Sequence, residues 1–420
     1  GRHVVVMVPG VQDRREGVPG EDAPEADAEF GPATLPYGVF STTDDPTPRP
    51  GVAIGDHVLD LGAAARAQGA SFADTVSGTN LDPLLAAGRP VWDRVRDEVT
   101  TWLTDPAHEE TIRPHLADRA SARLHLPLTV ADYVDFYSSE HHASNVGRMF
   151  RPDQEPLTPN WKHLPIGYHG RAGTVVVSGT DIVRPVGQRK PAGEPEPLFG
   201  PSTRLDIEAE VGFVVGTPTP MGERVDIDAF ADHVFGVFLL NDWSARDLQG
   251  WEYVPLGPFL GKSFATSISP WIVPLSALGA ARVVQPTQDP EPLPYLRGTE
   301  PWGLDLHLEV ALNGHVVSHP PFREMYWTAA QQLAHMTVNG ASLRTGDVYA
   351  SGTVSGAEPA QRGCLLELTW SGREPLVLPD GAERTFLQDG DEVTITATAP
   401  GPDGTRVDFG AVTGRVLPAH

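Results

Sequence analysis

Cysteine, positive charge and long apolar runs are all scarce in this sequence of 420 residues. Cys364 is the only cysteine, so the chain can form neither an intrachain disulfide nor a cysteine-based zinc site. No apolar run approaches the roughly 20 residues of a membrane-spanning helix, and the apolar stretch 4–8 is too short for the core of a signal peptide. We therefore expect a soluble protein of a reducing, cytoplasmic compartment.

The charge balance limits the partners that the chain can bind. Lys and Arg number 31 against 55 Asp and Glu, which gives a formal net charge of −24. Binding to nucleic acid or to an anionic membrane surface needs clustered cationic side chains. We therefore expect neither nucleic acid nor a membrane as a partner.

The composition favours a folded, turn-rich protein. Hydrophobic residues make up 40% of the chain and charged residues 20%, while Gly and Pro number 43 and 41. Short strands are expected over residues 173–177, 205–215, 234–240, 306–312, 365–370 and 392–398, with turns between them. This spacing is typical of a rolled or sandwiched antiparallel sheet. Helices are expected over 82–87, 91–103 and 326–336.

Three regions follow from these patterns. Residues 1–34 form an acidic segment rich in Gly, Pro and Ala, which we expect to be mobile. Residues 35–125 suit a small β-rich domain with a helical tail, and residues 126–420 a large catalytic domain.

Several common catalytic motifs are missing from the sequence. It has neither the Gly-x-Ser-x-Gly of a nucleophile elbow nor a His-Glu-x-x-His zinc motif. Residues 257–263 resemble a phosphate-binding loop, but one spacer residue is missing and Pro258 removes a backbone donor. Cys364 alternates with apolar residues, which predicts a small buried side chain in a strand.

Acidic residues alternate with apolar ones near residue 208. In a strand, Asp206, Glu208 and Glu210 share one face. That face is either a solvated outer surface or a site for a hard cation such as Mg²⁺ or Ca²⁺. Asp242 follows the apolar run 234–240 and is either a helix cap or a further ligand at a strand end.

Two further segments carry reactive side chains. Asp135, Tyr137 and the adjacent pair His141 and His142 lie close enough in sequence to supply a ligand, a substrate contact and a base, although each alone is more often structural. Lys262 lies in an apolar, proline-rich segment, where it needs an anionic partner or must extend to the surface.

Longer runs give a family resemblance. Residues 135–139, 167–171, 206–210, 241–247 and above all 251–264 are similar to signatures of the fumarylacetoacetate hydrolase family. The resemblance extends over about residues 35–417. It implies hydrolysis of a carbon–carbon bond in 4-fumarylacetoacetate to fumarate and acetoacetate, the last step of tyrosine and phenylalanine breakdown. It also implies a homodimer that binds Mg²⁺ or Ca²⁺. The implied fold is mainly β (α+β), with a small N-terminal SH3-like β-barrel followed by a large mixed β-roll.

The resemblance also assigns roles to residues. The implied metal ligands are Asp135, Glu208, Glu210 and Asp242, with Lys262 and Thr266 near the ion. The implied substrate contacts are Tyr137, Arg151, Tyr168, Gln249, Tyr253 and Thr353. The implied catalytic residues are His142, Glu367, Arg246, Gln249 and Lys262.

Elementary chemistry agrees with these roles. Water is a poor nucleophile, so the neutral His142 imidazole would take its proton, and Glu367 would fix the tautomer. Arg246, Gln249 and Lys262 would stabilise the tetrahedral alkoxide. Only the family register selects His142 over His141. The alternatives are an acylpyruvate hydrolase, a decarboxylase of related diketo acids, and a cation-stabilised binding protein without catalysis.

Overall fold

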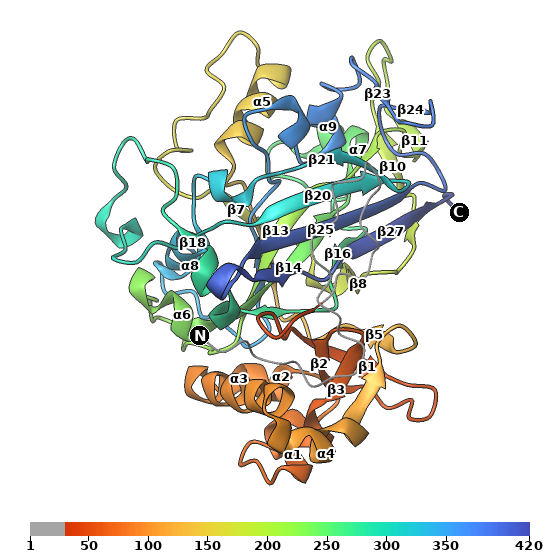
Figure 1. The fold of residues 1–420 in the computed structure, drawn as a ribbon. Helices are drawn as coiled ribbons and strands as arrows, with labels where there is room; N and C mark the ends of the chain where they lie inside the picture. Colours follow the sequence, from red (N-terminus) through yellow and green to blue (C-terminus); the bar gives the residue numbers. More distant parts are fainter. Residues whose placement is uncertain (1–29) are drawn as a thin grey trace.

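The structure is a computed structural model that describes residues 30–420. An N-terminal part of strands and helices lies against one end of a larger body built from two curled β-sheets (Figure 1). None of the helices within residues 30–420 combines the length and the hydrophobicity of a transmembrane segment. The β-rich architecture that we expected is present in these sheets, and helices cover parts of them, so the fold is mixed.

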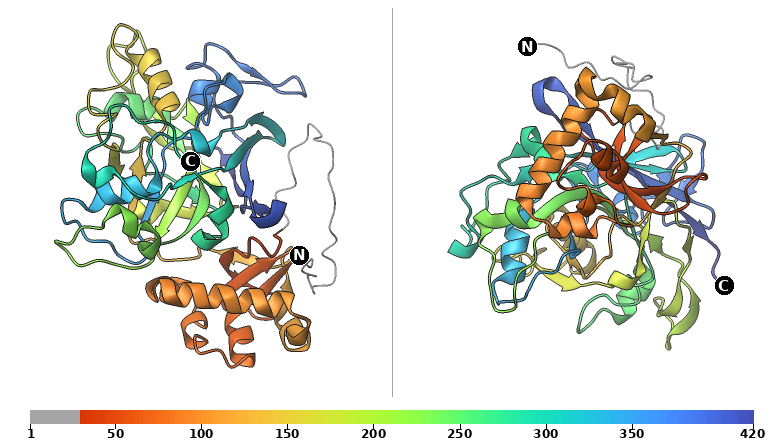
Figure 2. Two further views of the ribbon diagram at one scale, coloured as in Figure 1. Left: turned by 60° about the vertical axis from the view of Figure 1, so that its left-hand side comes forward. Right: turned by 90° about the horizontal axis from the view of Figure 1, so that it is seen from below.

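The N-terminal part contains one antiparallel sheet in the order β4-β3-β2-β1-β5. Its strands are β1 (Tyr37–Ser41), β2 (Arg49–Ile54), β3 (His57–Asp60), β4 (Leu116–Asp118) and β5 (Arg123–His125). Its helices are α1 (Leu61–Ala67), α2 (Asp82–Ala86), α3 (Arg89–Thr104) and α4 (Glu109–Ile112). The helices expected over 82–87 and 91–103 correspond to α2 and α3, and α3 crosses beneath the strands in Figure 2. Closure of this sheet into an SH3-like barrel stays a prediction.

The acidic segment 1–34 lies outside the described residues except for its last five. The mobility expected of this segment stays a prediction. Phe30 is buried with its ring 5.9 Å from that of Trp271, and the Thr34 hydroxyl accepts a hydrogen bond from the Asp408 backbone N–H. An aromatic contact and a satisfied hydroxyl therefore hold the end of this segment.

The larger body begins with a sheet in the order β7-β6-β22-β13-β14-β16-β8, with β17 also paired to β14. Its strands are β6 (Tyr133–Phe136), β7 (Gly167–His169), β8 (Val175–Val177), β13 (Ala209–Val215), β14 (Val234–Asp242), β16 (Thr266–Ile268), β17 (Val273–Pro274) and β22 (Val348–Ala350).

A second sheet has the order β21-β20-β25-β27-β9, with β26 paired to β25. Its strands are β9 (Ile182–Val183), β20 (His307–Leu312), β21 (His315–Ser318), β25 (Glu392–Pro400), β26 (Arg406–Asp408) and β27 (Val412–Leu417). Short two-stranded ribbons complete the body: β10 (Val186–Arg189) with β11 (Leu198–Pro201), β12 (Leu205–Asp206) with β15 (Ser244–Ala245), β18 (Arg282–Val283) with β19 (Gly303–Leu304), and β23 (Leu376–Val377) with β24 (Glu383–Arg384). Its helices are α5 (Glu140–Phe150), α6 (Phe230–His233), α7 (Arg246–Glu252), α8 (Ala329–Thr337) and α9 (Leu365–Leu368).

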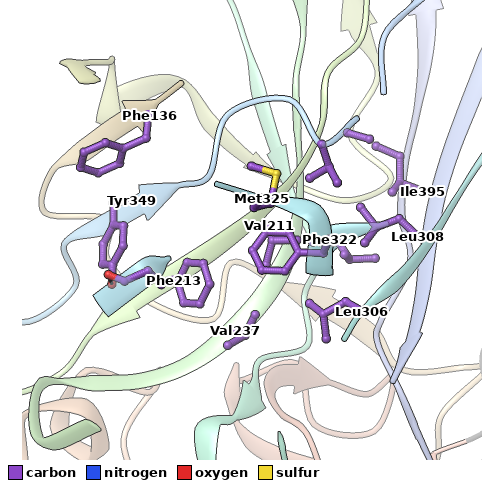
Figure 3. Close-up of a cluster of buried hydrophobic side chains, with 14 of the residues drawn as sticks. Phe136, Val211, Phe213, Val237, Leu306, Leu308, Phe322, Met325, Tyr349 and Ile395 are labelled. Atoms are coloured by element: carbon purple, nitrogen blue, oxygen red, sulfur yellow. Dashed lines mark hydrogen bonds between the residues drawn. The ribbon is translucent and has the colours of Figure 1, made fainter. Parts of the chain in front are cut away.

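The strand pair β13 and β14 is buried on both faces. On one face, Val211, Phe213 and Val237 join the core between the two large sheets, where Leu308 and Ile395 meet them (Figure 3). On the other face, alternate residues of the same strands join a cluster with the N-terminal part. A strand covered on both faces reads as a continuous apolar run, which explains residues 234–240.

Two strand predictions were wrong. The strand expected over 205–215 breaks after Asp206 and resumes at Ala209, so it forms β12 and β13. Residues 365–370 contain the short helix α9 rather than a strand, and Cys364 is its N-cap residue. A short apolar run cannot distinguish a buried strand from a buried helix by periodicity alone.

The helix expected over 326–336 begins later. It is α8, and it starts at a capping box in which Thr328 and Gln331 satisfy each other's backbone N–H groups.

Candidate active site

Four buried carboxylates from separate stretches of the chain meet at one end of the large sheet. Asp135 lies in β6, Glu210 in β13 and Asp242 at the end of β14, while Glu208 precedes β13. Side chains alternate along a strand, so Glu210 and Asp242 share the face that the N-terminal part covers further along. One oxygen from each carboxylate lies within 4.8 Å of the others. The alternative of a solvated outer face is therefore wrong for Glu208 and Glu210.

Burial raises the pKa of Asp135, Glu210 and Asp242. The charge of Lys262 opposes this effect, and the negative charge of Glu208 adds to it. The Asp135 Oδ1 atom and both carboxylate oxygens of Glu210 are buried, and within residues 30–420 they have no hydrogen-bond partner. Such oxygens are ligands for a hard divalent cation. The residues present therefore fit a divalent metal ion.

Two positively charged side chains, those of Lys262 and Arg246, pair with Glu208. Lys262 Nζ lies 2.8 Å from Glu208 Oε2 and 3.0 Å from Asp242 Oδ2, and Arg246 Nη1 donates to Glu208 Oε1 at 2.9 Å. Burial alone would raise the pKa of Glu208, but Lys262 and Arg246 outweigh it and lower that pKa. Lys262 is buried in this ion pair, so the alternative of a surface lysine is wrong.

Arg246 and Gln249 lie on α7, which begins directly after β15. The Gln249 Oε1 atom accepts from Arg246 Nη1 at 3.3 Å, whereas Arg246 Nη2 is buried without a hydrogen-bond partner in the described chain. A buried guanidinium donor without a partner is available to an incoming oxyanion.

An imidazole–carboxylate pair joins α5 to α9. His142 Nδ1 lies 2.6 Å from Glu367 Oε2, and both side chains are buried. Since an ionised carboxylate only accepts, Nδ1 carries a proton, and in the neutral form of the imidazole Nε2 is left as an acceptor. Asn145 Nδ2, Ser355 Oγ and Cys364 Sγ donate to the same carboxylate at 2.9, 2.9 and 3.1 Å.

These contacts keep Glu367 ionised. Burial alone would raise the pKa of its carboxyl, but the charge of His142 and the hydrogen bonds from His142, Asn145 and Cys364 lower it from 4.5 to about 2. His141 lies elsewhere, because its half-exposed ring is 3.5 Å from Glu324. The geometry therefore distinguishes the two histidines, although the role of His142 stays a prediction.

The expected substrate contacts are only partly brought together. The Tyr137 ring packs edge-on against His142 at 5.4 Å, and the Tyr168 hydroxyl donates to Asp135 Oδ2 at 2.8 Å. The Thr353 hydroxyl is buried and has no partner among residues 30–420. Arg151 is half-buried and donates to the Pro156 carbonyl, whereas Tyr253 is 44% exposed at the end of α7.

A cavity of about 180 Å³ opens beside the carboxylate cluster. Its lining includes the Tyr168, Asp242, Lys262 and Thr266 side chains, together with Tyr133 and Phe259. Thr266 stands opposite Asp242 in the β14–β16 register. A small molecule in this cavity would lie next to Lys262 and to Asp242, the member of the carboxylate cluster that lines it.

Sequence reasoning missed three partners of Glu367, namely Asn145, Ser355 and Cys364. It also placed Asp206 on one face with Glu208 and Glu210, although Asp206 is not among the four carboxylates that converge. Asn145 follows His142 by three positions, and this helical spacing was a usable signal. Ser355 and Cys364 carried no local signal, because only the fold brings their segments to α9.

Comparison with known proteins gives concordant results. The family models described as "Fumarylacetoacetase N-terminal" and "Fumarylacetoacetate (FAA) hydrolase C-terminal" match residues 33–127 and 132–417. The chain is 48% identical to a fumarylacetoacetase of Arabidopsis thaliana over 412 residues, which cover 94% of this chain and 97% of the relative. It is 48% identical to the fumarylacetoacetase of Homo sapiens over 408 residues, which cover 94% of this chain and 97% of the relative. It is 42% identical to that of Dictyostelium discoideum over 415 residues, which cover 94% of this chain and 96% of the relative.

Two solved structures share the fold. A fumarylacetoacetate hydrolase from Exiguobacterium antarcticum aligns with a TM-score of 0.54 at 17% identity, over 92% of this chain and 100% of that one. A putative HpcE protein from Mycobacterium smegmatis aligns with a TM-score of 0.53 at 21% identity, over 91% and 99%. At these identities the likeness concerns the fold alone.

Proposed function

Because the chain belongs to the fumarylacetoacetate hydrolase family and is a hydrolase, we propose that it hydrolyses 4-fumarylacetoacetate to fumarate and acetoacetate by means of a water molecule activated by His142. The observation that carries the mechanism is the buried His142–Glu367 pair, and the charge of His142 also lowers the pKa of Glu208 in the carboxylate cluster. A cation-stabilised binding protein would need the carboxylates but not the imidazole pair.

We propose that Asp135, Glu208, Glu210 and Asp242 hold one Mg²⁺ or Ca²⁺ ion, with Lys262 and Thr266 beside it. The unpartnered oxygens of Asp135 and Glu210 support this. When bound there, a divalent cation supplies Lewis-acid polarisation of a β-diketone and neutralises developing negative charge. Lys262 and Arg246 offset the excess negative charge of the four carboxylates.

In the proposed mechanism, His142 Nε2 accepts a proton from water, and the water oxygen adds to a ketone carbonyl of the substrate. Glu367 fixes the neutral imidazole with its proton on Nδ1 and stabilises the imidazolium that forms. Arg246, Gln249 and Lys262 donate to the alkoxide, for which the free Arg246 Nη2–H is suited. The carbon–carbon bond then breaks, the carbonyl re-forms as the fumarate carboxyl group, and Lys262 protonates the acetoacetate carbanion. The new carboxylic acid returns a proton to Lys262, and His142 releases the proton that it took from water to the solvent.

The remaining assignments follow from family membership. We propose that Tyr137, Arg151, Tyr168, Gln249, Tyr253 and Thr353 contact the substrate. We further propose a cytoplasmic homodimer that acts in tyrosine and phenylalanine catabolism. An SH3-like N-terminal barrel, a domain boundary near residues 125–126 and a C-terminal catalytic β-roll belong to the same proposal.

The assay that tests this function measures loss of diketone absorbance with fumarylacetoacetate in the presence of Mg²⁺ or Ca²⁺. Fumarate and acetoacetate should appear in equal amounts. Turnover of acylpyruvates without turnover of fumarylacetoacetate would replace the proposal by an acylpyruvate hydrolase. Release of carbon dioxide without fumarate would replace it by a decarboxylase.

A further inference from the structure

Asp206 is a fully buried carboxylate that lies outside the metal-binding cluster. It ends β12, two residues before Glu208, yet it is not among the four carboxylates that converge. An ionised carboxylate in such a position is costly unless its oxygens are fully paired. Its partners therefore indicate what it is for.

Each oxygen of Asp206 accepts two hydrogen bonds. Oδ1 accepts from the backbone N–H groups of Ile207 and Leu365, both at 2.7 Å. Oδ2 accepts from the backbone N–H of Leu366 and from Arg246 Nε, both at 2.9 Å. Two of these partners open α9, and a third is a guanidinium of the proposed active site.

The contact with α9 replaces a missing cap. Cys364 occupies the N-cap position of α9 but makes no capping hydrogen bond with its side chain. The first N–H groups of a helix have no partner within the helix. Asp206, more than 150 residues earlier in the chain, satisfies two of them. The position of α9 therefore depends on Asp206, and α9 carries Glu367.

The contact with Arg246 fixes the orientation of its guanidinium group. Asp206 holds the Nε edge of the guanidinium, while Nη1 reaches Glu208 and Gln249. This leaves Nη2 as the donor without a partner in the described chain. One carboxylate thus fixes both the helix that carries the partner of the base and the guanidinium proposed to meet the oxyanion.

We propose that Asp206 is a positioning residue that sets the distance between the His142–Glu367 pair and Arg246. This inference rests on the proposed function, because it assigns a role within the same reaction. In this proposal Asp206 contacts neither the substrate nor the divalent ion, and it acts through Glu367 and Arg246. Its removal should therefore impair turnover much more than substrate binding.

The Asp206→Asn variant tests this. A carboxamide keeps the shape of the carboxylate, but in either orientation its NH₂ group faces two N–H donors. We expect kcat to fall about 100-fold, as for a displacement of about 1 Å in a catalytic group, while KM changes much less. Asp206→Glu, which keeps the charge but is one methylene longer, gives the same test if the asparagine variant does not fold.

Asp391→Asn is the matched control. Asp391 is also buried and also accepts four hydrogen bonds, from Arg384 Nε and Nη2, Asn313 Nδ2 and the Gln388 backbone N–H. We expect this variant to lose a similar amount of thermal stability yet to keep kcat within about twofold when assayed well below its Tm.

A double-mutant cycle separates positioning from general destabilisation. If Asp206 acts partly through Glu367, Asp206→Asn should cost much less in a Glu367→Gln background than in the wild type. Amide hydrogen exchange of Leu365 and Leu366 should also accelerate in Asp206→Asn but not in Asp391→Asn.

Two results would overturn the inference. One is a kcat for Asp206→Asn within about twofold of that for Asp391→Asn. The other is full additivity with Glu367→Gln. An inactive wild-type enzyme would instead refute the proposed function, and amide exchange would still report whether Asp206 holds α9.

Discussion

Replacing Glu367 by glutamine tests the imidazole–carboxylate pair directly. Glutamine is isosteric and can keep the hydrogen bond from Asn145, but it brings no charge to the imidazolium that the proposed mechanism forms at His142. The pKa of the Glu367 carboxyl falls from 4.5 to about 2, largely through His142. A difference of this size corresponds to about 3 kcal/mol between the two protonation states. About 3 kcal/mol in the activation barrier corresponds to roughly a 100-fold change in rate.

We therefore expect Glu367→Gln to lower kcat by about 100-fold, and by more if the glutamine selects the wrong tautomer of His142. The assay is the initial rate of diketone loss at saturating substrate. Glu324→Gln is the matched control, because Glu324 is paired with His141, next to His142 in sequence, at 3.5 Å on a half-exposed surface. We expect that variant to keep its kcat. A Glu367→Gln enzyme within about threefold of the wild type would refute the reasoning, as would an equal loss in Glu324→Gln.

Three further predictions follow from the same geometry. His142→Ala should abolish turnover while His141→Ala keeps it, and calorimetric titration should give both variants nearly wild-type affinity for Mg²⁺ or Ca²⁺; residual activity in His142→Ala would point to another base. Chelation of divalent ions should lower the Tm more strongly at pH 8 than at pH 5. The pKa values of Glu210 and Asp242 are raised in the fold, so the ion-free protein loses stability as the pH rises and these carboxyls ionise. Scanning calorimetry at both pH values checks this, and an equal loss of Tm at the two would contradict it. The stability that Glu367 contributes should be complete above about pH 4.5 and disappear as the pH falls towards 2, so urea unfolding of Glu367→Gln should show a weaker pH dependence in that range than the wild type.

The sequence predicted the elements with strong local patterns. The apolar run 234–240 is typical of a buried strand, and β14 is that strand. Helices α2 and α3 also follow from local periodicity. The carboxylates could be suspected from alternation in one strand and from an acidic residue at the end of another. Only the family resemblance linked Asp135 to them, because pairing between distant strands leaves no local trace.

The errors have one physical cause. Residues 365–368 carry no helix-start signal of their own, because the group that caps α9 is the side chain of Asp206. Alternation placed Asp206 beside Glu208 and Glu210, and it could not reveal the break in the strand after residue 206. A residue whose partners all lie elsewhere in the chain, such as Ser355 beside Glu367, can be assigned only from the fold.

The N-terminal part covers the strands that carry Glu210 and Asp242 on the same sheet face as these two side chains, further along the strands. Trp92 and Tyr37 each pack against Phe235 of β14 with ring centres 5.3 Å apart, on the sheet face that leads to the carboxylates. The packing around the strands that carry these two carboxylates is thus shared between two regions of the chain that are far apart in sequence. Substitutions that weaken these aromatic contacts would destabilise the strands that carry the two carboxylates. Affinity for the divalent ion and the Tm should therefore decline together in such variants, even though no proposed ligand or catalytic residue has been changed.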